Sequence, residues 1–173
     1  FPAPVSNANL NTSQRIADTI FGAMADVLPE RSMAACSGTM TGFSIGGYNQ
    51  EEEKYFSYVE TYGGGQGALD DMDGMDGVHT NMTNTLNTPV EVMEQSFPFS
   101  VKNYGYIDDS GGAGKHRGGT GLQREIQLLD DGFTITLTAD RAKNQPWGLF
   151  GGEGGQTSQC SIFTNEGAEI KIK

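Results

Sequence analysis

Glycine restricts the fold of this chain more than any other residue, because 15 of its 25 glycines are gathered in three stretches. They crowd into residues 63–67, 111–121 and 148–155. Without a Cβ, such stretches favour turns and loops in which the backbone itself makes the contacts, and they disfavour long helices. At 173 residues the chain fits one domain, 1–173, or part of a larger one, and the glycines indicate that long loops occupy much of it. The expected loops are 62–89, 108–121 and 144–156.

One segment, 12–28, has the periodicity of an amphipathic helix. Asn11, Thr12 and Ser13 offer side-chain oxygens for its N-terminus, and Pro29 follows its end. Apolar residues recur three and four positions apart, which predicts that this stripe packs on a sheet. The stripe consists of Ile16, Ile20, Ala23, Met24, Val27 and Leu28.

After Arg31 the pattern changes to short aromatic and β-branched runs separated by glycine, which are typical of strands. Within 133–139, apolar side chains alternate with threonines, as in a strand with one buried face. Asp131-Gly132 predicts a hairpin between two strands, and Gly167 predicts another. The expected fold class is α+β, with one N-terminal helix packed on a glycine-rich, mostly antiparallel β region with long loops. The strand segments are 33–49, 54–68, 97–107, 121–129, 132–142 and 158–173.

Charge excludes one class of partner. The chain carries 22 acidic and 11 basic residues, a net charge of −11. Nucleic-acid binding needs a basic surface, so we expect no nucleic-acid partner. No apolar run is long enough for a membrane span and no signal peptide is recognisable at the start. We therefore expect a cytoplasmic protein without membrane contact.

The cysteines and the first residue lead to two further expectations, one on disulfide bonding and one on whether the chain is part of a longer protein. Cys36 and Cys160 lie far apart without a C-x-x-C motif, so two reduced, buried thiols are favoured over one long-range disulfide. The chain begins with Phe1 rather than Met and enters a turn-rich segment at once. We interpret it as a fragment or a processed subunit of a longer protein.

The stretch 108–121, DDSGGAGKHRGGTG, resembles a phosphate-binding loop only at first sight. A P-loop needs Ser or Thr after its Gly-Lys pair, and His116 stands there instead. A dinucleotide fingerprint needs glycine where Arg117 stands. Two interpretations are left: an anion held by backbone amides beside Lys115 and Arg117, or glycines that permit a tight crossing of chains. The second is favoured.

Three other positions suggest chemistry. His79 lies in a loop rich in amides and hydroxyls, where it could act as a general acid or base, ligate a metal with Asp76, or be a hydrogen-bonded surface residue. With two histidines in all, a closed metal site within this chain alone is not expected. Glu60 is a candidate inward-facing acid at the end of a strand, and Asp140-Arg141 ends another strand at a position suited to ion pairs.

Five blocks of the sequence, in order, resemble the hydantoinase B/oxoprolinase family. They are SNANLNTSQRIADTIFGAMADVLPERSMAACSGT, YVETYGGGQGA, DGMDGVHTNMTNTLNTPVEVMEQSFP, DSGGAGKHRGGTGLQRE and ADRAKNQPWGLFGGEGG. This family comprises the B-type subunit, or half, of ATP-dependent N-methylhydantoinases, 5-oxoprolinases, caprolactamase, and acetone and acetophenone carboxylases. The resemblance covers almost the whole chain, and it is specific for the family rather than for a substrate.

The resemblance implies an ATP-dependent hydrolase that opens a cyclic amide such as a hydantoin, 5-oxoproline or a lactam. It also implies an A-type partner subunit that supplies ATP and Mg²⁺, and a divalent metal held in an N-terminal part of the subunit that lies outside this chain. By this resemblance, residues 1–173 are a C-terminal fragment of a longer B-type subunit. Two alternatives are left open. In the first, the chain is part of a ketone carboxylase of the acetone or acetophenone type. In the second, it is a structural module that docks the partner and carries no catalytic groups.

Residue chemistry suggests the site. An arginine fork suits a carboxylate or phosphate, glycine amides can approach a substrate oxygen, and an imidazole can move a proton. The candidate catalytic residues are His79, Asp109, Arg117 and Arg141. The candidate substrate-binding residues are Glu60, Gly64, Gly65, Asn84, Ser110 and Gly118.

Overall fold

The structure is a computed structural model that describes residues 10–172 of the chain. It contains two α-helices, α1 (Leu10–Met24) and α2 (Val90–Ser96), and a short 3-10 helix, η1 (Pro29–Arg31). The strands are β1 (Gly42–Asn49), β2 (Lys54–Thr61), β3 (Phe99–Tyr106), β4 (Leu122–Leu128), β5 (Thr134–Thr138), β6 (Cys160–Phe163) and β7 (Glu169–Ile172). Neither α-helix in the described part of the chain has the length and apolarity to cross a bilayer.

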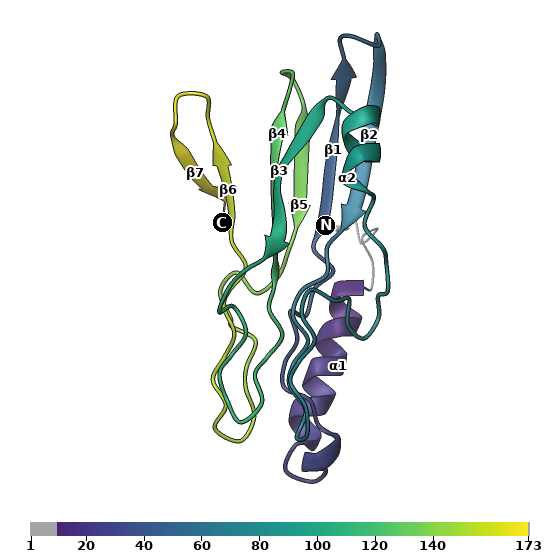
Figure 1. Cartoon of the computed structure of the whole chain (residues 1–173). Helices are drawn as coiled ribbons and strands as arrows, with labels where there is room; N and C mark the ends of the chain where they lie inside the picture. The colour runs from purple at the N-terminus through teal and green to yellow at the C-terminus, as the bar shows by residue number, and fades with distance from the viewer. Residues whose placement is uncertain (1–9, 173) are drawn as a thin grey trace, which may run out of the picture.

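The strands form three small antiparallel sheets, so the expected α+β fold with an N-terminal helix is confirmed. One sheet has the order β2-β1-β5, and β3-β4 and β6-β7 are separate pairs. Figure 1 shows the strands in the upper half of the molecule and α1 with the long loops in the lower half. The loops are 62–89, 107–121 and 139–159, close to the expected positions.

A small aromatic core joins the sheets. Ile45 of β1, Tyr58 of β2, Met93 of α2 and Phe99 of β3 are buried together. Their burial follows from the alternation of side chains in the strands, which turns one face of each inward. Pro89 directly precedes α2, where its fixed φ suits a helix start. This core lies wholly in the upper half, so the loops below must be held by other contacts.

The prediction for the helix is wrong in its packing. The predicted apolar stripe is exposed, with Ile16 at 54%, Ile20 at 56% and Val27 at 70% exposure. The buried positions of α1 are instead Gln14 and Asp18, which are 0% and 3% exposed. Polar partners on the loops override hydrophobic patterning here, because a buried amide or carboxylate can be satisfied only by other polar groups.

The predicted helix ends also differ. Because α1 begins at Leu10, Asn11 lies inside the helix, and its side-chain oxygen accepts hydrogen bonds from Thr39 Oγ1 and Met40 N rather than capping. The helix ends at Met24, before Pro29.

The Asp131-Gly132 hairpin is also wrong as a strand pairing. Gly132 adopts a φ of +79°, as a turn requires, but β4 pairs with β3 whereas β5 pairs with β1. Long-range pairing therefore outweighs the local turn signal. The second hairpin is confirmed, since β6 pairs with β7 and Gly167 has a φ of +82°.

Candidate functional site

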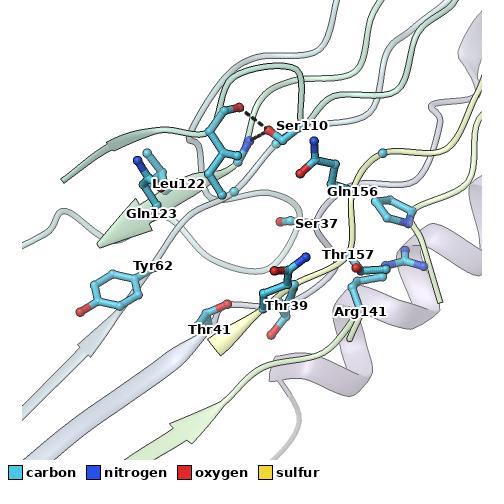
Figure 2. Close-up of a pocket in the computed structure, with 18 of the residues that line it drawn as sticks. Ser37, Thr39, Thr41, Tyr62, Ser110, Leu122, Gln123, Arg141, Gln156 and Thr157 are labelled. Carbon is cyan, nitrogen blue, oxygen red and sulfur yellow. Dashed lines mark hydrogen bonds between the residues drawn. The ribbon is translucent and has the colours of Figure 1, made fainter. Parts of the chain in front are cut away.

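A groove of about 1550 Å³ runs between the β1 side of the molecule and the glycine-rich loops. Its upper part is apolar, with Ile135 and Leu137 of β5 on the wall, so the alternating face of that strand points into the groove. Its lower part is lined by hydroxyl and amide side chains together with glycine backbone. Figure 2 shows the side chains of Ser37, Thr39, Thr41, Ser110, Gln156 and Thr157 around this space.

The glycines allow the loops that wall the groove to touch backbone to backbone. A Cβ on Gly65 would lie 1.9 Å from the carbonyl oxygen of Gly119, and a Cβ on Gly119 would lie 1.9 Å from that of Met75. The loops are also hydrogen-bonded to each other, since Gly119 N donates to Gln66 O at 2.8 Å and Ser37 N donates to Gly65 O at 2.9 Å. The favoured interpretation of the glycines, a tight crossing of chains, is confirmed.

Arg117 holds two of these loops together. Its Nη1 and Nη2 donate to the two carboxylate oxygens of Asp76 at 2.7 and 2.9 Å, and Thr120 N donates to Asp76 at 2.7 Å. The Arg117 guanidinium holds the pKa of the Asp76 carboxyl well below its usual range. Lys115 Nζ lies 3.5 Å from the Asp70 carboxylate and donates to the Asp70 backbone carbonyl at 3.0 Å. Both cations beside the glycine loop are therefore engaged by loop 62–89.

Arg141 is engaged by α1. Its Nη2 donates to Asp18 Oδ2 at 2.7 Å, and both side chains are almost fully buried. The other Asp18 carboxylate oxygen, Oδ1, accepts a hydrogen bond from the Cys36 thiol at 3.1 Å. Burial, with the Asp18 charge beside it, raises the pKa of Cys36 to about 11. Asp140 pairs with Arg15 of α1 at 3.6 Å, so Asp140-Arg141 does form ion pairs, both with the helix.

His79 hydrogen-bonds a hydroxyl rather than an acid. Its Nδ1 lies 3.0 Å from Thr83 Oγ1, and its Nε2 is buried without a hydrogen-bond partner among residues 10–172. Burial lowers the pKa of His79, which favours the neutral imidazole. Asp76 is paired with Arg117, and residues 10–172 contain no cluster of three His, Cys, Asp or Glu side chains that could hold a metal.

Glu60 is buried, as expected, and its partner is Arg124, a residue that the sequence analysis missed. Arg124 Nη1 donates to Glu60 Oε2, and both side chains are nearly inaccessible to solvent. The guanidinium lies 4.7 Å from the Tyr62 ring centroid and 4.0 Å from that of Tyr104. A signal was present: Arg124 shares its strand face with the apolar Leu122 and Ile126, and a charge there calls for a buried partner.

The structure brings some of the predicted site residues together and separates others. Asn84 and Glu60 border a second depression, of about 430 Å³. His79, Asp109 and Arg117 border neither space, and Asp109 is an exposed residue with a φ of +54°. The predicted residues on the groove wall are Gly64, Gly65, Ser110, Gly118 and Arg141.

The structure is an α+β fold whose glycine-rich loops wall a groove with an apolar upper part and hydroxyl and amide side chains below. The family described as hydantoinase B/oxoprolinase matches residues 1–173, and the chain belongs to this family.

Relatives agree with this assignment. An uncharacterised protein of Methanocaldococcus jannaschii is 47% identical over 99% of this chain and 29% of its own length. A 5-oxoprolinase of Dictyostelium discoideum is 36% identical over 99% of this chain and 13% of its own length. A putative B-type subunit of a D-/L-hydantoinase from a Pseudomonas species is 36% identical over 98% of this chain and 28% of its own length. The chain thus spans less than a third of each.

A solved structure shares the fold. Nucleotide-free acetone carboxylase, described in connection with ATP-dependent acetone carboxylation, matches with a TM-score of 0.62 and 22% identity. The match covers 79% of this chain and 18% of that protein.

Proposed function

We propose that this chain is part of an ATP-dependent cyclic amidase that opens a hydantoin, 5-oxoproline or lactam ring together with an A-type subunit. The observation that carries the proposal is the lower groove, where hydroxyl and amide side chains lie beside glycine backbone. A cyclic amide is uncharged at the reacting group and offers both a carbonyl acceptor and an N–H donor. Ser, Thr and Gln side chains both donate and accept hydrogen bonds, so this wall fits such a ring.

The partner subunit is proposed to supply ATP and Mg²⁺. Loop 108–121 departs from a P-loop at His116, and residues 10–172 hold no acid or imidazole cluster suited to a metal. The residues present thus do not fit either group, and a divalent metal is proposed for a part of the subunit outside this chain. What this chain contributes is orientation of the ring and exclusion of water by closely packed loops.

Under this proposal the candidate site residues fall into three groups: substrate-binding residues, positioning residues and residues away from the groove. Gly64, Gly65, Ser110 and Gly118 border the groove as substrate-binding candidates. Arg117 and Arg141 act through the loops and α1 that they hold, as positioning residues. His79 and Asp109 lie off the groove wall, and their catalytic roles stay predictions for substitution in the full complex.

The test uses the full-length protein with its A-type partner. We expect ATP hydrolysis that depends on hydantoin, 5-oxoproline or 2-pyrrolidinone. Ser37→Ala and Thr157→Val should each raise KM, because each removes a hydroxyl from the groove, whereas Thr12→Val on the exposed side of α1 should not. ATP turnover that requires bicarbonate and a ketone would instead establish the carboxylase alternative.

The docking alternative has an observation of its own, the exposed apolar stripe of α1. We propose that this stripe contacts the A-type subunit, since a relative is named as one subunit of a hydantoinase and an apolar surface of this kind is stabilised by burial. Docking and groove chemistry are compatible, because Ile16 and Ile20 of the stripe lie on the face of α1 opposite the buried Gln14 and Asp18.

A further inference from the structure

Arg124 stands apart from the other arginines near the groove. It projects from β4, borders the groove, and is 3% exposed at its side chain. Arg117 uses both terminal nitrogens to bind Asp76, and Arg141 donates to Asp18. Arg124, by contrast, makes all of its hydrogen bonds through Nη1, to Glu60 Oε2 and more weakly to Tyr62 and Met93.

The opposite edge of the Arg124 guanidinium is unused. Its Nε and Nη2 are buried and have no hydrogen-bond partner among residues 10–172. These two N–H groups point the same way in a fixed fork, which is the arrangement that grips an oxygen acceptor. Buried donors without partners are rare in native proteins because each forfeits its hydrogen bonds to water.

The charges around the Arg124 guanidinium determine which kind of acceptor its free edge can bind. Glu60 already neutralises Arg124, and Thr88 N donates to the second oxygen of that carboxylate. The neighbouring phenols stay neutral, since burial raises the pKa of Tyr62 to about 12 and also raises that of Tyr58. A second carboxylate would add an uncompensated negative charge beside Glu60 in a buried place, whereas a carbonyl oxygen would add none.

We propose that the Nε–Nη2 edge of Arg124 binds a carbonyl oxygen of the uncharged amide ring in the groove, so that Arg124 determines both the orientation of the ring and the preference for a neutral group. This inference rests on the proposed function. Both nitrogens are closed to solvent, so the wall must open locally for the ring to enter. Tyr104, which covers one face of the guanidinium and is 39% exposed, is the contacting side chain with most room to move.

The Tyr104 hydroxyl donates to Asn87 at 2.8 Å, and Asn87 in turn donates to Thr61 O at 2.8 Å. This chain of contacts holds the Tyr104 ring over Arg124. Loss of the Asn87 contact should therefore ease entry and exit of the ligand without touching the fork itself. Asn87→Ala is expected to raise both the association and the dissociation rate of the amide ring.

The experiment measures binding of hydantoin to the full-length protein with its partner by titration calorimetry. Arg124→Lys keeps a cation for Glu60 and removes the fork, and we expect it to weaken hydantoin binding about ten-fold to a hundred-fold, as for hydrogen bonds to a charged group. Arg31→Lys, on exposed η1, is the matched control and should change binding less than two-fold. Equal binding by Arg124→Lys and the wild type overturns the inference.

A structure of the full-length protein with hydantoin covers the case in which Arg124→Lys does not fold. A ring oxygen within hydrogen-bond distance of Nε and Nη2 supports the inference. A water, or a backbone carbonyl from another part of the polypeptide, in that place overturns it. Failure of the proposed reaction is separate: the wild type would then show no amide-dependent ATP turnover, whatever Arg124→Lys does to binding.

Discussion

Asp18 and Arg141 lie 123 positions apart in sequence, yet Arg141 Nη2 lies 2.7 Å from Asp18 Oδ2 with both side chains nearly buried. This contact ties α1 to the segment that follows β5 and places the Cys36 thiol against the same carboxylate. It is one of several polar contacts that stabilise the lower half of the molecule, where the aromatic core does not reach.

Arg141→Ala should destabilise the protein by up to about 3–5 kcal/mol, because it removes the closer of the two cations beside the buried Asp18 carboxylate and leaves only Arg15, at 3.7 Å. Urea unfolding of the full-length protein measures the change. Lys54→Ala provides the comparison: Lys54 pairs with Glu52 at 3.0 Å on the surface and should cost at most about 1 kcal/mol. If the two substitutions lowered the free energy of unfolding by similar amounts, the Asp18–Arg141 pair would not stabilise the fold as inferred.

Asp76 should make the packing of the glycine loops sensitive to acid. Its folded pKa is depressed by Arg117, so its contribution is present above the unfolded pKa of about 4 and is lost as pH falls through the folded value. Thr120 N donates to Asp76. In the wild type, the local opening that permits hydrogen exchange at this amide should therefore become more frequent below about pH 4. Asp76→Asn should show faster exchange at neutral pH and lack that acid step. An identical acid step in Asp76→Asn would contradict this assignment.

Gly65→Ala and Gly119→Ala should each cost about 1–3 kcal/mol or more, since the new methyl would collide with a backbone carbonyl that cannot move freely. Gly105→Ala on β3 is the control, because its nearest neighbour would be a side-chain atom 3.9 Å away. Thermal unfolding distinguishes the loop sites from the control. A stable Gly119→Ala variant would mean that the loops are looser than their crossing implies.

Cys36 should resist iodoacetamide at neutral pH in the folded protein. Its thiol is buried and its pKa is raised to about 11, so almost no thiolate is present. Cys160 is partly exposed and should be modified first, slowly, because burial also raises its pKa. Peptide mapping by mass spectrometry reports each site, with urea-unfolded protein as the control. Modification of Cys36 before Cys160 would argue against the buried thiol.

Ile20→Lys should weaken assembly with the A-type subunit while leaving the unfolding temperature of the isolated subunit within a few degrees, since Ile20 is 56% exposed. Thr19→Lys, on a neighbouring exposed position, controls for added charge. Analytical ultracentrifugation of the mixture measures assembly. If Ile20→Lys instead unfolds the full-length subunit, the stripe is covered by the same polypeptide and the docking proposal falls.

Several elements could be predicted because their signals are local. Short aromatic and β-branched runs placed β3 and β4 within a few residues, alternation of side chains placed β5, and Gly167 marked a hairpin. The glycine clusters indicated tight backbone crossings, since only a missing Cβ permits such approach. Glu60 was expected to face inward because of its place at a strand end, and it does.

Other features depend on partners far away in sequence. The period of the apolar residues in α1 indicated a helix correctly, but which face is buried was decided by Asp18 meeting Arg141 and by Gln14 meeting Thr80 and Thr83. Likewise, β4 and β5 are adjacent in sequence and belong to different sheets. The Arg117 fork, expected to hold a ligand, is occupied by Asp76, and the free fork belongs to Arg124.

The amino-acid pattern alone was enough for the α+β class, the positions of the strands and loops, the need for glycine at chain crossings and the family. The tertiary structure decided which charges neutralise each other and which donors are left free at the groove. The physical reason is that strand and turn preferences act over a few residues, whereas the state of a buried charge depends on whatever the fold places within a few ångströms of it.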